Sequence, residues 1–421
     1  MMQKMNMREV IDKMFILEET GFHTTLLGIG PMSRNLIVAS LELAKEKDFP
    51  ILFIASRNQV DAKELGGGYV CGWDQQGFKE AIAAIAKEVD FTGLYYLCRD
   101  HGGPWQRDNE RNGHLPEAIA MELAKKSYVE DLINQFDLLH IDPTKDPYVI
   151  GKSIDMEVVL RRTVNLIEYV EMERKARNLP EIGYEVGTEE TNGGLTSQES
   201  YEFFIQQLTN ELSRRGLPTP VFIVGQTGTL TRLTENVGSF SYHSSKVLAD
   251  TAKKYGVGLK EHNGDYLDDY IILDHPSLNI TAMNVAPEFG YIETKAYLEL
   301  IRLEEKEVEN GRLEDKSNLK AVMSREAVNS GRWKKWLIGD DVHLSVEAIL
   351  GEEELVATIC EICGHYTYEQ EDVKREMAIL YGNMQKLGID GNRYVVDKIK
   401  NSIDRYVQCF NLQGLTSKLL H

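Results

Sequence analysis

Eight short apolar runs, each followed by a helix-patterned stretch, constrain the fold of this chain more than any other feature. The runs are rich in β-branched, leucine and aromatic residues, as strands buried on both faces are. They lie at Thr24–Gly30, Ile51–Ser56, Leu94–Cys98, Leu138–Asp142, Ile182–Gly187, Pro220–Gly225, Gly258–His262 and Leu278–Val285. The stretches between them carry apolar residues at helical spacing, so each can form a crossover helix between parallel strands.

This alternation predicts an α/β fold, a (β/α)₈ TIM barrel, because right-handed crossovers give such a pattern few other arrangements. An open doubly wound sheet is the competing architecture. It usually carries G-x-G-x-x-G after a strand, whereas Gly28-Ile-Gly30 here is followed by Pro31. The rest of the chain is almost entirely helix-patterned. We therefore expect a barrel with an N-terminal helix over residues 1–290, and a helical C-terminal extension over 291–421 packed on it.

Composition excludes several function classes. The formal net charge of −19 over 421 residues argues against a nucleic-acid partner, although a local basic pocket could still hold a sugar phosphate. No apolar run approaches the length of a membrane span, and the charged N-terminus predicts no signal peptide. Five cysteines are few and odd in number for a chain of this length, which argues against a disulfide framework. They indicate a reducing, cytoplasmic location. Cys360 and Cys363 invite a metal or redox interpretation, but their apolar neighbours at helical spacing favour packing.

Polar and charged residues follow the predicted strands at the ends that meet at one mouth of a barrel. These residues are Arg57, Asn58, Gln59, Asp100, His101, Asp142, Glu185, Glu189, Gln226, His262 and Asn284. Two histidines and a carboxylate from three strands can form a divalent-metal site with positions left open for substrate oxygens. Asp100, Glu189 or Asp142 would remain for proton transfer. The alternative is that such acids cap the following helices, as Asp142 could.

The same residues carry a resemblance to a known family. Its motifs here are Ser56-Arg-Asn-Gln-Val60 with Gly66-Gly-Gly-Tyr69, Asp100-His-Gly-Gly-Pro104, Leu139-His-Ile-Asp142, Val186-Gly-Thr-Glu189, and Glu261-His262 with Asp265-Tyr266. In order and spacing they resemble the tagatose-bisphosphate aldolase non-catalytic subunit family, also labelled tagatose 6-phosphate kinase. That family is similar to the class II ketose-bisphosphate aldolases and to ketose-phosphate 4-epimerases.

The resemblance implies specific roles. The metal, zinc, manganese, cobalt or nickel, would be held by His101, Glu185 and His262, with Asp100 as the proton carrier. Gln226 occupies the region where class II aldolases carry another metal-binding histidine, and His243 is a nearby substitute. The expected substrate-binding residues are Arg57, Asn58, Gln59, Gln226, His243, Asp265 and Asn284. Catalytic roles fall to Asp100, Glu189 and Asp142.

Two functions from different classes follow. The first is a metal-dependent aldolase or 4-epimerase that acts on a ketose or ketose phosphate of the tagatose or fructose type. It would break the C3–C4 bond while a carboxylate takes the C4 hydroxyl proton. The second is a non-catalytic barrel that stabilises and activates a separate aldolase subunit. The acids beside the proposed ligands favour the enzyme, and homo-oligomerisation is expected in either case.

Overall fold

A computed structural model describes residues 4–188, 194–337 and 339–421. Within these ranges, eight parallel strands close into a barrel in the spatial order β1, β2, β3, β4, β5, β6, β9, β10. They are β1 (Leu26–Ile29), β2 (Ile51–Ser56), β3 (Tyr95–Gly102), β4 (Leu138–Ile141), β5 (Gly183–Val186), β6 (Phe222–Val224), β9 (Gly258–Glu261) and β10 (Ala282–Val285). The predicted barrel is confirmed.

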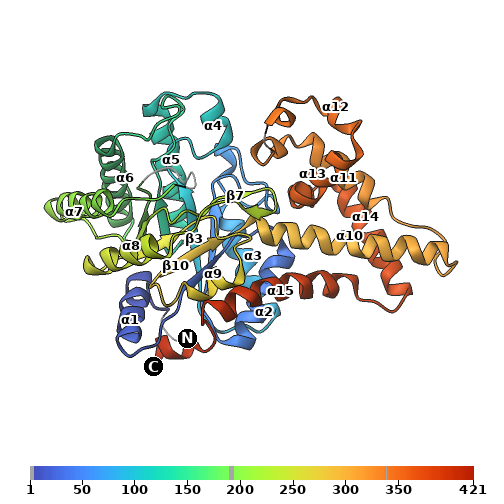
Figure 1. Cartoon of the computed structure of the whole chain (residues 1–421), viewed down its shortest axis with the longest axis horizontal. Coiled ribbons are helices and arrows are strands. Elements are labelled where there is room, and N and C mark those ends of the chain that lie inside the picture. The colour runs from blue at the N-terminus through green and yellow to red at the C-terminus, as the bar shows by residue number, and fades with distance from the viewer. Residues whose placement is uncertain (1–3, 189–193, 338) are drawn as a thin grey trace.

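Helices surround this barrel, and α1 (Met7–Glu19) lies near the N-terminus (Figure 1). The others up to β10 are α2 (Arg34–Lys47), η1 (Lys63–Leu65), α3 (Gln75–Glu88), α4 (Asp108–Asn112), α5 (Glu117–Ile133), α6 (Met156–Ala176), α7 (Gln198–Arg214), α8 (Tyr242–Lys254) and α9 (Asp269–Asp274). A small antiparallel hairpin, β7 (Thr231–Arg232) with β8 (Glu235–Asn236), follows β6 and was not expected from the sequence.

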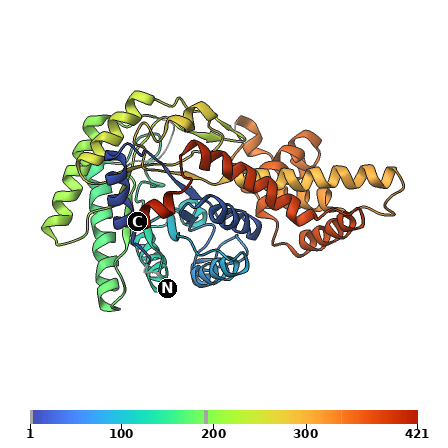
Figure 2. The same ribbon diagram turned by 90° about the horizontal axis from the view of Figure 1, so that it is seen from below.

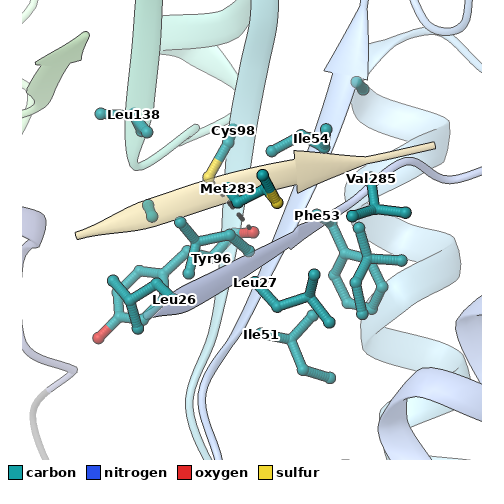
Figure 3. Close-up of a cluster of buried hydrophobic side chains, with 14 of the residues drawn as sticks. Leu26, Leu27, Ile51, Phe53, Ile54, Tyr96, Cys98, Leu138, Met283 and Val285 are labelled. Carbon is teal, nitrogen blue, oxygen red and sulfur yellow. Dashed lines mark hydrogen bonds between the residues drawn. The ribbon is translucent and has the colours of Figure 1, made fainter. Parts of the chain in front are cut away.

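The barrel strands are buried on both faces, which explains why their sequences show no polar alternation. Figure 3 shows apolar side chains from β1, β2, β3, β4 and β10 gathered in one cluster. Those labelled are Leu26, Leu27, Ile51, Phe53, Ile54, Tyr96, Cys98, Leu138, Met283 and Val285. Burial of each large aliphatic side chain contributes about 1.5–3 kcal/mol to folding, so this core holds the strand ends in fixed positions.

The C-terminal region is helical, as predicted. Its elements are α10 (Pro287–Glu309), α11 (Leu319–Asn329), η2 (Arg332–Lys335), η3 (Gly339–His343), α12 (Val346–Leu350), α13 (Glu353–Cys363), η4 (Gly364–Tyr366), α14 (Glu371–Lys386), α15 (Gly391–Cys409) and α16 (Leu415–Leu420). Helix α10 leaves the barrel after β10, and α15 returns along it to pack against α2 (Figures 1 and 2). A second hydrophobic cluster surrounds Trp333. The domain division near residue 290 stays a prediction.

The structure also bears on two smaller predictions, the packing of two cysteines and the lack of a membrane-spanning helix among the described residues. Cys360 and Cys363 lie buried in hydrophobic clusters as free thiols, and burial raises the pKa of Cys360 to about 11. Their predicted packing role is confirmed. Among the described helices, none combines the length and apolar character needed to cross a membrane.

Glu293 joins the extension to the barrel through a buried contact with the start of α2. Its Oε2 accepts a hydrogen bond from the hydroxyl of Ser33 at 2.6 Å. Ser33 in turn caps α2, because its hydroxyl oxygen accepts a hydrogen bond from the backbone N–H of Leu36. The side chain of Asn35 donates to Oε1 at 3.1 Å. Burial raises the pKa of Glu293 to about 7, although both hydrogen bonds lower it. The folded protein therefore binds a proton here more tightly than the unfolded chain does.

This pKa predicts a pH dependence of stability. The contribution of Glu293 is complete below its ordinary pKa of about 4.5 and is lost as pH rises to about 7. Glu293→Gln should remove up to about 3 kcal/mol of that loss between pH 5 and pH 8, measured as the free energy of unfolding in urea. Glu299→Gln on the same helix is the control, since the pKa of Glu299 is lowered rather than raised. Parallel pH profiles for the wild type and Glu293→Gln would contradict the prediction.

Candidate metal and substrate site

Four side chains from three strand ends converge at the carboxyl end of the barrel. Asp100, His101, His140 and His262 each offer a ligand atom, and these atoms all lie within 4.8 Å of one another. Asp100 and His101 belong to β3, His140 to β4, and His262 follows β9. Active sites of (β/α)₈ barrels lie at this end of the strands.

A bulge in β3 brings two consecutive residues to the cluster. The predicted strand ended at Cys98, but pairing continues through Ser56 with Asp100 and Gly102 with Ile141. The register shifts between Arg99 and Gly102, and His101 has a φ of 42°. Successive side chains of a regular strand point to opposite faces, whereas a bulge re-aims one of them. A positive φ at a histidine costs of order 1–3 kcal/mol, so the surrounding fold holds this conformation in place.

Asp142 orients the ring of His101. Its Oδ2 lies 2.7 Å from Nδ1 of His101, while Thr144 donates to Oδ1 from both its hydroxyl and its backbone N–H. Burial would raise the pKa of Asp142, but these partners and His140 hold it well below its usual range. The carboxylate therefore accepts the Nδ1 proton, and Nε2 of His101 turns toward the cluster.

Glu185 orients His262 in the same way from the other side. Its Oε1 lies 2.6 Å from Nε2 of His262, and its Oε2 lies 2.5 Å from Nζ of Lys260. Burial would raise the pKa of Glu185, but Lys260, His140 and His262 lower it by more, so the pKa lies below its usual range. Because Glu185 accepts the Nε2 proton, Nδ1 of His262 is left as a bare acceptor facing the cluster.

Three acceptor atoms consequently face one another. Nδ1 of His262 lies 3.0 Å from Nε2 of His101, and Oδ1 of Asp100 lies 3.6 Å and 3.8 Å from those two nitrogens. Donor atoms about 2.1 Å from a tetrahedral cation are about 3.4 Å apart, so the triangle fits a divalent metal. In the metal-free protein a proton can bridge the imidazoles. Burial lowers the pKa of His101, but Asp100 and Asp142 raise it by more.

Asn284 on β10 holds Asp100 in this triangle. Its amide donates to Oδ1 of Asp100 at 3.0 Å. A Cβ on Gly28 would lie 2.2 Å from the amide oxygen of Asn284, so the neighbouring strand needs glycine there. That amide oxygen is buried and, within the described part of the chain, has no hydrogen-bond partner. A polar substrate or ligand could supply one.

His140 lies against the cluster with its ring neutral. The backbone N–H of His101 donates to its Nδ1 at 3.2 Å, so the ring proton sits on Nε2. Burial lowers the pKa of His140 to about 4, despite Glu185 and Asp142 nearby. With Nδ1 already occupied, His140 supports His101 and is a weaker candidate for a ligand.

The structure places Glu185 differently from the expectation that it would converge with both histidines. It contacts the outer nitrogen of His262 and is absent from the group of four described above. Among the predicted acids, Asp100 is in that group and Asp142 contacts His101. Glu189 lies outside the described residues.

Arg57 was expected to face the mouth, but its guanidinium is buried in ion pairs. It contacts Asp61 at 3.1 Å and Glu110 at 2.7 Å. Arg99 and Arg107 join the same network. Because its guanidinium is paired with buried carboxylates, Arg57 holds the loops beneath the mouth together and is a poor candidate for substrate binding.

The remaining predicted substrate residues also have other partners. Asn58 contacts the backbone of Gln106 and Asp108, and Gln59 accepts from Ser56 N. Gln226 is buried and its backbone N–H donates to Thr196.

His243 is exposed in the first turn of α8 and is not one of the four clustered residues. Asp265 is buried and accepts from Ala286 N and Glu288 N at 2.9 Å each, which caps α10. Burial raises the pKa of Asp265 to about 7.

His140 and Lys260 were not among the predicted site residues. Each lies two residues before a predicted site residue on a buried strand, His140 before Asp142 and Lys260 before His262. Residues two apart on a strand share a face. A polar residue in an otherwise apolar run, at that offset, was the signal that could have identified both.

A (β/α)₈ barrel with a histidine–carboxylate cluster at the carboxyl ends of its strands is the class that fold and site define. The family model described as "D-tagatose-1,6-bisphosphate aldolase subunit GatZ/KbaZ-like" matches residues 11–390, and the chain belongs to that family. The predicted family is thus confirmed.

Solved structures support the fold. A probable tagatose 6-phosphate kinase from Sinorhizobium meliloti 1021 is 17% identical, with a TM-score of 0.73, covering 91% of this chain and 100% of its own. A fructose-bisphosphate aldolase from Campylobacter jejuni is 12% identical, with a TM-score of 0.53, covering 97% and 96%. No curated protein sequence matches this chain.

The geometry predicts which residues hold a metal. His101→Gln and His262→Gln should each weaken divalent-metal binding by at least about 100-fold, because each removes one of three convergent acceptors. Calorimetric titration with Mn²⁺ or Zn²⁺, with metal analysis after dialysis, measures this. His243→Gln is the matched control and should bind like the wild type. Undiminished metal content in both site variants would refute the assignment.

Proposed function

We propose that this chain is a divalent-metal-dependent enzyme that cleaves the C3–C4 bond of a ketose phosphate, as an aldolase or a 4-epimerase. The observation that supports this most is the convergence of three acceptor atoms from Asp100, His101 and His262. Membership of a tagatose-bisphosphate aldolase subunit family fits the same chemistry.

His101 and His262 would hold the cation, with Asp100 on the third side. When bound, such a cation stabilises negative charge that develops on substrate oxygens. The two carboxylates behind the histidines keep the imidazoles aimed inward, and the buried surroundings strengthen every interaction of the site.

Asp100 is the proposed proton carrier. Burial would raise the pKa of Asp100, but His101, His262 and His140 lower it, so the group is a carboxylate at neutral pH. Its side chain is 12% exposed, enough for one oxygen to meet a substrate hydroxyl. Asn284 holds Oδ1, which leaves Oδ2 to take the C4 hydroxyl proton as the bond breaks. After C3–C4 cleavage, the enediolate fragment can add back to the other face of the aldehyde fragment. Return of the proton to the C4 oxygen then gives the epimer.

Basic residues of the barrel loops and of the extension support a phosphorylated substrate. Lys335 in η2 is exposed to solvent, and the charges of Lys145, Arg111, Arg332 and Asp108 lie near enough to act on it. Lys145 also lies near enough to His101 to offset part of the rise in the pKa of that histidine. In a chain of net charge −19, a group of four basic side chains, one of which acts on His101, suits a phosphate group.

A second candidate function is supported by the family description, which names an aldolase subunit. In that role the chain would stabilise a separate catalytic subunit and keep its cluster without turnover. Catalysis by the isolated chain separates the two functions.

The first test is turnover of Asp100→Asn. This variant keeps size and most hydrogen bonds but removes the base, so kcat should fall about 10²–10⁴-fold on tagatose or fructose phosphates. The assay uses the isolated chain with each divalent metal, and Asp12→Asn, at an exposed position on α1, is the control. If the wild type converts no ketose phosphate, yet Asp100→Asn raises the activity of an added aldolase subunit as the wild type does, the subunit function holds instead.

The second test concerns the phosphate. Lys335→Met should raise KM for the ketose phosphate about tenfold with kcat nearly unchanged, because phosphate is bound equally in ground and transition states. The adjacent Lys334→Met should change neither constant. Equal KM values for Lys335→Met and the wild type would exclude this phosphate position.

A further inference from the structure

Lys260 is a buried ammonium group inside the barrel. It lies on β9 and is 1% exposed, with its Nζ 5.5 Å from the ring centroid of Phe222. An unpaired lysine is strongly disfavoured in such surroundings, and this one is paired with Glu185 at 2.5 Å. Neither the family match nor the proposed reaction assigns it a role.

The contacts of Lys260 form a line that ends at the metal cluster. Nζ of Lys260 meets Oε2 of Glu185, and Oε1 of Glu185 meets Nε2 of His262. Nδ1 of His262 then faces His101 and Asp100. Lys260 and His262 are two residues apart, so both point to the same side of β9.

Glu185 decides which nitrogen of His262 faces the cluster as a bare acceptor. As a carboxylate it can only accept, which places the ring proton on Nε2 and leaves Nδ1 free. Glu185 keeps this position through its second oxygen, which Lys260 holds at 2.5 Å. A carboxylate buried without a cation is strongly disfavoured, so without Lys260 the side chain would leave this position and Nε2 would lose its acceptor. The ring proton could then occupy Nδ1, the nitrogen that the metal needs.

We propose that Lys260 is a positioning residue that holds the carboxylate of Glu185 against Nε2 of His262 and thereby presents Nδ1 of His262 to the cation. The inference rests on the metal site of the proposed function. Lys260 touches neither metal nor substrate in this account. Its influence passes through two hydrogen-bonded neighbours, and loss of such outer partners typically weakens metal binding 10–100-fold.

Metal affinity of the full-length protein tests the inference. Lys260→Met keeps the length of the side chain and removes its charge, so the Kd for Mn²⁺ or Zn²⁺ in calorimetric titration should rise about 10–100-fold. The double variant Glu185→Gln with Lys260→Met removes both charges and keeps an amide oxygen that can accept from Nε2. The Kd of the double variant should be at least tenfold lower than that of Lys260→Met, since the two side chains are coupled.

Two controls separate this effect from instability. Lys253→Met breaks another lysine–glutamate pair, with Glu18 on the outer helices, and should leave the Kd unchanged. Ring-nitrogen NMR of the metal-free wild type, with His262→Gln for assignment, should report the proton of His262 on Nε2. The proton on Nδ1 would contradict the inference.

The outcomes distinguish this inference from the proposed function. No metal binding by the wild type would overturn the proposed function itself. Tight binding by both the wild type and a folded Lys260→Met would overturn the inference alone. Should Lys260→Met fail to fold, the double variant decides: binding within tenfold of the wild type supports the inference, and a larger loss contradicts it.

Discussion

The contact between Nδ1 of His262 and Nε2 of His101, at 3.0 Å, is the interaction on which the candidate site depends. Each imidazole gives its outer N–H to a buried carboxylate, Glu185 on one side and Asp142 on the other. Two nitrogens without protons would repel each other at that distance, so a proton or a cation must lie between them. The third acceptor, from Asp100, favours a cation.

The barrel supplies the rigidity that this arrangement needs. Its closed sheet fixes β3, β5 and β9, and the bulge in β3 turns His101 inward at the cost of a positive φ. Beneath the mouth, Arg57 and its buried carboxylates hold the loops after β2 and β3. Asp265 caps α10, so the extension begins at a fixed point beside the site.

Much of the fold could be predicted from the sequence, because eight apolar runs separated by helical patterns permit few arrangements. Asp100, His101 and His262 were also identifiable, since polar residues at strand ends meet at one edge. The orientation of side chains could not be predicted. The bulge at His101 leaves no signature in a single sequence. The position of Arg57 after a strand predicts a residue at the mouth, and only the fold shows that its guanidinium is paired with buried carboxylates. Glu185 illustrates the same limit, since whether a carboxylate contacts a metal or a histidine depends on a few tenths of a nanometre.

The central claim is that one divalent cation lies between the two imidazoles. Anomalous diffraction from crystals soaked in Mn²⁺ or Zn²⁺, collected above and below the metal absorption edge, tests it most directly. The account predicts a single strong peak about 2.0–2.3 Å from Nε2 of His101 and Nδ1 of His262, with Oδ1 of Asp100 on its third side. A peak bonded instead to Glu185, or no peak between the imidazoles in protein that binds the metal, would contradict it.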